Sequence, residues 1–259
     1  MPNTSKRTFL LSCALLASQA LHLPGARAAP PTVTLFLGDT LDTKGRQKQL
    51  QPWRRKLFDY LEQELAIQFD IKVYPWTRAE RHALNGEGLI FGLPKTASRL
   101  RELHYSDAAS NNTLWLVTRS DAVFPFNGLQ DLRGKTLGAV RGYSYGDEFE
   151  CERNKLFRVD DEIASRATRL QRLLLKRVDA VLLYQPSGES QADFEANLRA
   201  YIQPYLKDLV IPPGVTLSVL HKPLQSENGM YFAVAREQDD GLIERINLAL
   251  ARQRKLAQR

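Results

Sequence analysis

The length and composition of the chain narrow the class of protein. It has 259 residues, of which 43% are hydrophobic and 25% charged, enough apolar material for one large α/β unit or two lobes with cores. Disordered and fibrous proteins are therefore excluded. The cysteines form no CxxC pair and lie near no histidine cluster, which excludes a disulfide scaffold and a thiolate zinc site. Beyond residue 30, no apolar stretch is long enough to cross a bilayer.

The first 28 residues have the pattern of a cleaved signal peptide. Lys6 and Arg7 precede an apolar run at 9–20, and residues 26–28 read Ala-Arg-Ala, the A-x-A pattern of a cleavage site. Cleavage removes three positive charges and no acidic residue, so the net charge of +7 gives little support to nucleic-acid binding. We expect a periplasmic protein. A lipid anchor on Cys13 is disfavoured because the apolar run continues beyond that residue.

The first part of the mature chain alternates predicted strands and helices. Pro52 stands at a first helical position, and the apolar residues that follow it recur at a spacing of four, which predicts an amphipathic helix. Thr77 and Glu80 have the spacing of a capping box at the start of a shorter helix, which Asn85 and Gly86 would end. The predicted strands are 33–38, 69–73 and 89–91.

The same alternation continues to the end of the chain. Apolar residues at helical spacing predict helices at 163–174 and 242–250. The apolar run 178–183 is typical of a strand buried on both faces of a parallel sheet. This pattern favours an α/β fold with mostly parallel sheets covered by helices. The other predicted strands are 114–117, 136–140, 215–220 and 230–235.

Candidate ligand-binding positions follow the predicted strands. In open α/β sheets, ligands bind beyond the carboxyl ends of strands, where helix N-termini offer free N–H groups. Periodicity therefore predicts a pocket at these junctions but does not identify its ligand. The junctions are Gly38-Asp39, Pro75-Trp76, 92–99, 142–146 and Tyr184-Gln185.

Six segments follow one another in a particular order and spacing between residues 33 and 236. They are 75–79 (PWTRA), 90–99 (IFGLPKTASR), 103–107 (LHYSD), 129–134, 135–144 (KTLGAVRGYS) and 178–183 (VDAVLL). This succession, rather than any one motif, resembles the family 3 extracellular solute-binding proteins, periplasmic receptors that supply polar amino acids to ABC importers.

The resemblance implies a two-lobed, type II periplasmic-binding-protein-like clamshell, in which each lobe is a mostly parallel sheet covered by helices. Two crossover strands join lobe 1, at 29–110 plus 215–259, to lobe 2, at 111–214. Lobes of this kind close around a ligand by hinge motion. The implied function is binding of a small carboxylate-bearing solute, with an amino acid as the favoured candidate, for an ABC permease. We expect a monomer with no cofactor, no metal and no nucleic-acid partner.

The resemblance also implies candidate ligand-binding residues. Arg99 matches the arginine that clamps the α-carboxylate of the ligand, for which a planar guanidinium is well suited. Ser144 matches the hydroxyl residue at a helix start that holds the same carboxylate. Trp76 and Phe91 stand where relatives pack on the ligand side chain. The alternative for Arg99 is a solvated surface arginine, and the alternative for Ser144 is a plain helix cap. For Trp76 and Phe91 the alternative is packing in the core.

One position departs from the family pattern. Tyr184 stands where relatives carry the aspartate that pairs with the α-ammonium of the ligand, and a tyrosine supplies no counter-charge at neutral pH. Either Asp39 or Asp147 replaces that aspartate, or the ligand lacks an α-amino group. The remaining candidate ligand-binding residues are Arg78, Gly92, Thr96 and Tyr143.

Two other functions use the same scaffold. An enzyme is disfavoured because the junctions offer no titratable pair, HExxH site or phosphate loop. We expect His82 to be an exposed helix residue and His104 a structural one. A ligand-sensing module for a membrane receptor would have the same clamshell as a transport receptor. The sequence does not separate transport from sensing.

Overall fold

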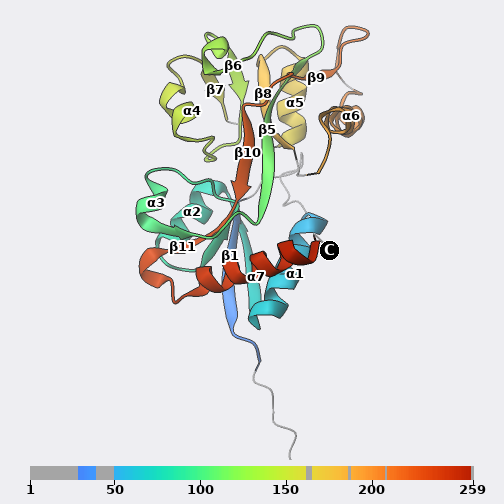
Figure 1. The fold of residues 1–259 in the computed structure, drawn as a ribbon. Coiled ribbons are helices and arrows are strands. Elements are labelled where there is room, and N and C mark those ends of the chain that lie inside the picture. Colours follow the sequence, from blue (N-terminus) through green and yellow to red (C-terminus); the bar gives the residue numbers. More distant parts are fainter. Residues whose placement is uncertain (1–28, 39–49, 162–164, 186–187, 208, 258–259) are drawn as a thin grey trace, which may run out of the picture. The chain divides into compact units, whose positions relative to one another are not determined.

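Two β-sheets organise the chain in a computed structural model that describes residues 29–38, 50–161, 165–185, 188–207 and 209–257 (Figure 1). The strands are β1 (Thr32–Gly38), β2 (Gln68–Tyr74), β3 (Leu89–Phe91), β4 (Leu103–Tyr105), β5 (Ser110–Arg119), β6 (Thr136–Gly138), β7 (Arg158–Asp160), β8 (Ala180–Gln185), β9 (Leu217–Val219), β10 (Gln225–Met230) and β11 (Phe232–Ala235). The α-helices are α1 (Pro52–Leu65), α2 (Trp76–Leu84), α3 (Arg99–Glu102), α4 (Asp147–Glu152), α5 (Arg166–Leu174), α6 (Gln191–Ile202) and α7 (Leu242–Ala257). Short 3-10 helices lie at Leu129–Leu132, Gln203–Tyr205 and Arg236–Gln238.

The first sheet has the strand order β2-β1-β3-β11-β4. Strand β1 pairs in parallel with β2 and β3, with Leu35 opposite Leu89. Strand β11 returns from near the end of the chain and pairs antiparallel with β3 and β4. This sheet is therefore built from two separate parts of the sequence.

The second sheet has the strand order β10-β5-β8-β6-β7, and β9 pairs with β5. Strand β6 runs parallel to β7 and β8, whereas β5 is antiparallel to β8, β9 and β10. Strands β5 and β10 run side by side, and each continues directly toward a strand of the first sheet (Figure 1). They are the crossover strands of the fold.

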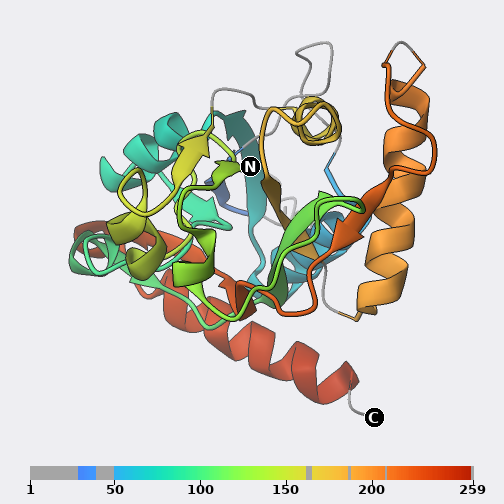
Figure 2. The ribbon, with the colours of Figure 1, turned by 90° about the horizontal axis from the view of Figure 1, so that it is seen from above.

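Helices cover both faces of the first sheet. Successive side chains of a strand point to opposite faces, so the apolar residues of β1 must be buried on both. On β1, Leu35 and Leu37 pack in a core with α1 and α7, while Phe36 packs in a second core with α2. Helix α1 lies beside α7, which runs along the periphery of the molecule to the C-terminal end (Figure 2). The sheet is thus the middle of three layers.

The second sheet is sandwiched in the same way. Trp115 and Val117 of β5 pack with α5 and α6 on one face, and Leu114 and Leu116 pack with Phe149 of α4 on the other. None of the helices in the described ranges has the length and apolar character needed to span a bilayer.

The predicted two-lobed α/β fold is confirmed, with some differences in detail. The sheets are mixed rather than mostly parallel because the crossover strands and β11 run antiparallel to their neighbours. The chain also rejoins the first sheet at β11, after Met230, and not at residue 215, because β9 and β10 are hydrogen-bonded to β5. Helix α6 was not predicted, although Ser190 caps it and Phe194, Leu198 and Ile202 recur at a spacing of four.

The predicted capping box at Thr77 and Glu80 is wrong. Helix α2 begins at Trp76 with Pro75 as its N-cap, so Thr77 lies inside the first turn and makes no side-chain cap. Glu80 instead pairs with Arg99. Proline has no side-chain acceptor to offer the first turn, and the N–H groups of Arg78 and Ala79 donate instead to the carbonyl oxygen of Pro75.

The aromatic centre of the first lobe provides a test of its core. Phe58 is fully buried and makes edge-to-face contacts with the rings of Phe69, Phe91 and Phe232, at centroid distances of 5.9, 5.3 and 6.0 Å. We expect Phe58→Ala to lower the free energy of unfolding by about 3–5 kcal/mol, through lost burial and the cavity left behind. Urea denaturation measures this. The control Leu248→Ala, at a side chain that is 52% exposed, should change it by less than about 0.5 kcal/mol.

Candidate functional site

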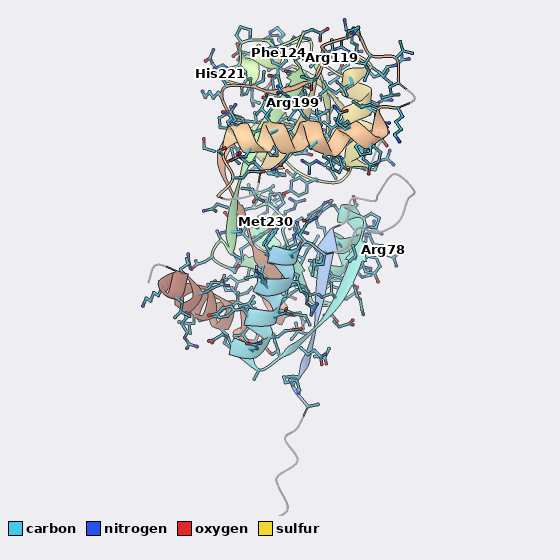
Figure 3. All side chains as sticks on the ribbon, turned by 90° about the vertical axis from the view of Figure 1, so that its right-hand side faces the viewer. Arg78, Arg119, Phe124, Arg199, His221 and Met230 are labelled. Carbon is cyan, nitrogen blue, oxygen red and sulfur yellow. The ribbon has the colours of Figure 1, made fainter. Side chains whose placement is uncertain are left out.

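A cavity of about 380 Å³ is lined by residues from both sheets and their helices. One side comes from β1, α1, β2, the start of α2 and Gly92 after β3. The other side comes from the segment after β6, the start of α5, and β8. The crossover strands contribute Asn112 and Met230 to the lining. Figure 3 shows Met230 between the side chains of the two sheets. The volume of the cavity is that of a site for a small molecule.

Aromatic side chains form much of the wall. The rings of Trp76 and Tyr143 meet edge to face with centroids 4.9 Å apart, and Tyr143 meets Tyr184 in the same way at 5.6 Å. Gly38 allows the indole of Trp76 to lie against the end of β1, because a Cβ at Gly38 would come within 1.9 Å of that ring. The tryptophan is therefore held in place from the first sheet and touches a tyrosine of the second lobe.

The hydroxyl of Tyr143 is tied to both sides of the cavity. It donates to the carbonyl oxygen of Gly92 over 3.5 Å and shares a hydrogen bond with Tyr184. Burial, partly offset by that bond and by nearby arginines, raises the pKa of Tyr143 to about 12. Burial also raises the pKa of Tyr184. Both phenols are neutral hydrogen-bonding groups at physiological pH.

Arginines supply the charge of the cavity. Arg54 of α1 lies on one side, and Arg166 and Arg169, one turn apart on α5, lie on the other. Burial is the main cause that lowers the pKa of each, and the charge of Arg166 further lowers that of Arg169. No described lining residue is an aspartate or a glutamate. The cavity is therefore suited to negatively charged groups.

The structure brings together a subset of the predicted ligand-binding residues. Trp76, Gly92, Tyr143 and Tyr184 line the cavity. Phe91 does not, since it is buried among Phe58 and Phe232 in the first core. Arg78 is also outside the lining, with its guanidinium stacked on Tyr74 at 4.4 Å on the surface (Figure 3). Asp39 lies outside the described residues.

Arg99 is occupied by an ion pair next to the cavity wall and is not part of the lining. Its Nε and Nη2 donate to the two carboxylate oxygens of Glu80 over 2.6 and 2.8 Å, and Nη1 donates to the carbonyl oxygen of Pro94 over 3.2 Å. Burial acts to lower the pKa of Arg99, but the bonds and charge of Glu80 outweigh it and the pKa is raised. A ligand carboxylate would have to displace Glu80, so the predicted clamp stays a prediction.

Ser144 and Thr96 are engaged in local hydrogen bonds outside the lining. The hydroxyl of Ser144 accepts from the N–H of Gly146, before α4 begins at Asp147. Thr96 Oγ1 lies 3.0 Å from Ser98 Oγ and accepts from the N–H of Arg99. The carboxylate of Asp147 accepts from the N–H of Ala97 over 3.0 Å, which links the second lobe to the first.

The cavity arginines were missed in the sequence, although a signal for them exists. Arg54 precedes Leu57, Phe58 and Leu61 at spacings of three, four and seven, so it falls on the buried face of α1. Arg166 precedes the buried Leu170 and Leu173 by four and seven residues, and Arg169 precedes Leu173 by four. A charged residue on the apolar stripe of a helix indicates either a buried partner or a ligand.

The pair of Glu80 and Arg99 gives a test of what holds α2 against α3. We expect Glu80→Ala to lower the free energy of unfolding by about 3 kcal/mol, because it leaves the guanidinium of Arg99 buried without its counter-charge. Asp59→Ala is the control, since Asp59 pairs with Arg55 and both are about half exposed; it should lose less than about 1 kcal/mol. Equal losses in urea denaturation would show that burial of the pair is unimportant.

The raised pKa of Tyr143 predicts that the folded chain loses stability at alkaline pH. Its pKa is about 12 in the folded chain and about 10 when unfolded, so the unfolded state releases its proton first. The contribution of Tyr143 to the free energy of unfolding is therefore fully present below pH 10 and is lost between pH 10 and 12. The slope of unfolding free energy against pH should be shallower in Tyr143→Phe than in the unchanged chain. An identical slope in both would contradict the assignment.

No family model and no curated protein matches this chain. Solved structures do match. A mutant of ArgBP from T. maritima has a TM-score of 0.63 at 21% identity, over 88% of this chain and 91% of that one. AbpA from Streptococcus pneumoniae, an amino acid ABC transporter substrate-binding protein bound to L-arginine, has a TM-score of 0.61 at 12% identity, over 87% and 90%. A histidine kinase sensor domain with similarity to periplasmic binding proteins has a TM-score of 0.65 at 16% identity, over 90% and 94%. The chain thus shares the two-lobed fold of these proteins.

Proposed function

We propose that the chain is an exported receptor that binds a small carboxylate-bearing solute, of which amino acids are one class, between its two lobes for delivery to an ABC importer. The observation that carries the proposal is the 380 Å³ cavity, which both lobes line and in which the described charged side chains are all arginines. Such a site holds an anion by charge-assisted hydrogen bonds. The fold is also that of amino acid ABC transporter substrate-binding proteins.

Closure of the lobes around a ligand follows from the contacts across the cavity. Trp76 with Tyr143, Gly92 with Tyr143, and Ala97 with Asp147 each join a residue of the first lobe to one of the second. Gly142, at a φ of +71°, approaches so closely that a Cβ there would lie 2.4 Å from Thr77 Oγ1. A ligand that touches both sides favours this arrangement over an open one.

A sensing role is the second candidate. The likeness to a histidine kinase sensor domain, at a TM-score of 0.65, supports it, because a sensor domain shares this fold. Transport and sensing make the same demand on the cavity and differ in the protein that contacts the outer surface. Both require export, in agreement with the signal peptide predicted at 1–28.

A thermal-shift screen of the mature chain tests the proposed binding function. The probes are the common amino acids and simple mono- and dicarboxylates. A ligand at a hundred times its Kd adds about 2.7 kcal/mol of stability, a rise in Tm of roughly 5–10 °C for a chain of this size. We expect at least one carboxylate to give such a rise and a neutral sugar to give none. Failure of every carboxylate and amino acid would overturn the proposed function.

The role of Arg99 is tested separately in the double variant Arg99→Met with Glu80→Leu. It removes both charges of the pair, so no buried charge is left without a partner. If Arg99 clamps the ligand carboxylate, the thermal shift given by the best ligand disappears. Arg101→Met is the control at an exposed arginine two residues away. An unchanged shift would remove Arg99 from the site and leave the receptor function standing.

A further inference from the structure

Positive charge is placed on both sides of the cavity, by different helices. Arg54 is in the first turn of α1, which covers the first sheet. Arg166 and Arg169 are in the first turns of α5, which covers the second sheet. Because residues three apart lie on the same face of a helix, Arg166 and Arg169 form one group and Arg54 forms another. The two groups are carried by different lobes.

Arg54 and Arg166 make no hydrogen bond and no ion pair with a described residue. The Nε of each is buried and unbonded there, and each guanidinium packs on aromatic rings instead. Arg54 lies 5.4 Å from the ring of Trp53, and Arg166 lies 5.1 Å from that of Tyr201. Glu189 raises the pKa of Arg166 by its charge but does not pair with it, and its carboxylate accepts from Asn197.

Burial of a guanidinium without an acceptor is unfavourable, because the lost hydration is not replaced. Folded chains tolerate such a group when a ligand completes its hydrogen bonds. Arg54 and Arg166 both line the cavity, so an anion inside it can reach each of them. Arg166 lowers the pKa of Arg169 by its charge, whereas Arg54 acts on the pKa of neither, so the two groups are separated across the cavity and we assign an anionic group to each.

The rest of the cavity wall is largely apolar and lacks a carboxylate. Trp76, Val140, Tyr143, Leu182 and Met230 supply rings and aliphatic groups. These surfaces suit an uncharged spacer between two anions. An ammonium group on the ligand would find no acidic side chain among the described lining residues and would be repelled by the arginines.

We propose that the solute is a dianion whose two negatively charged groups are separated by an apolar spacer and which carries no ammonium group. Arg54 binds one anionic group, and Arg166 with Arg169 binds the other. The inference rests on the proposed function, in that it takes this cavity as the receptor's ligand site. A ligand held from both lobes also stabilises their closed arrangement, because its two ends are satisfied only when both sides are in contact.

Calorimetric titration with matched probes tests the inference. Succinate, glutarate and adipate are compared with butyrate, valerate and hexanoate, which have the same chain lengths and one anionic group fewer. We expect the best dicarboxylate to bind about 10- to 100-fold more tightly than its monocarboxylate. Glutarate should also bind more tightly than glutamate, from which it differs by the ammonium group. Phosphoglycolate, which carries one phosphate and one carboxylate, is a further probe. If it binds more tightly than every dicarboxylate, the inference is supported and one of the two anionic groups is a phosphate.

Variants assign each end of the ligand. In Arg54→Gln and in Arg166→Gln, the preference for the dicarboxylate over the monocarboxylate should fall to within about threefold of unity. Arg55→Gln, at the exposed neighbour of Arg54, and Arg172→Gln, at an arginine of α5 that pairs with Asp160, should keep it. An unchanged preference in both cavity variants would overturn the assignment.

Stability of the ligand-free chain is an independent readout. Arg54→Met keeps the packing of the side-chain stem and removes an unpaired buried charge, so its Tm without ligand should equal or exceed that of the unchanged chain. A lower Tm would show that Arg54 already has a counter-charge and would count against the inference. Tighter binding of glutamate or glutamine than of every dianion would also overturn the inference and leave the receptor function intact.

Discussion

Burial of guanidinium groups beside a shared cavity is the constraint on which the rest of the site depends. Arg54 and Arg166 are partly buried, with their Nε atoms withdrawn from water, and pack on the rings of Trp53 and Tyr201, while the described part of the cavity wall supplies no carboxylate to neutralise them. The cores of the two lobes fix the helices that carry these arginines, through Leu57 and Phe58 on α1 and Leu170 and Leu173 on α5. The packing of these helices therefore fixes where the positive charges lie, whether or not a ligand is bound.

The aromatic residues between the lobes have a complementary role. Trp76 is seated on Gly38, where no larger residue would fit, and its edge-to-face contact with Tyr143 crosses from the first lobe to the second. Tyr143 in turn reaches the carbonyl oxygen of Gly92 and the hydroxyl of Tyr184. A wall of such rings lowers the local dielectric constant, which strengthens any charge-assisted bond formed in the cavity. They also supply contacts that exist only when the lobes are together.

The resemblance to family 3 solute-binding proteins led to the right fold and to part of the cavity wall. It directed attention to Arg99, which the structure shows in a two-bond ion pair with Glu80 and outside the lining. The difference at Tyr184, which lines the cavity without an acidic charge, agrees with a ligand that carries no ammonium group. Positive charge reaches the cavity from α1 and α5, on helix faces for which the resemblance had suggested no ligand contact.

The sequence by itself determined most of the elements and the α/β class, because the pattern of apolar residues decides what each helix and strand buries, as in α1 and β8. The expectation of two lobes came from the family resemblance. It also placed Trp76, Gly92, Tyr143 and Tyr184 at strand ends, where α/β folds bind ligands. Only the tertiary structure decided which charges remain without partners. Glu80 on α2 and Arg99 at the start of α3 are nineteen residues apart and meet only in the folded chain, whereas Arg54 and Arg166 come from helices of different lobes. Pairing of charges depends on such long-range proximity, and no local pattern encodes it.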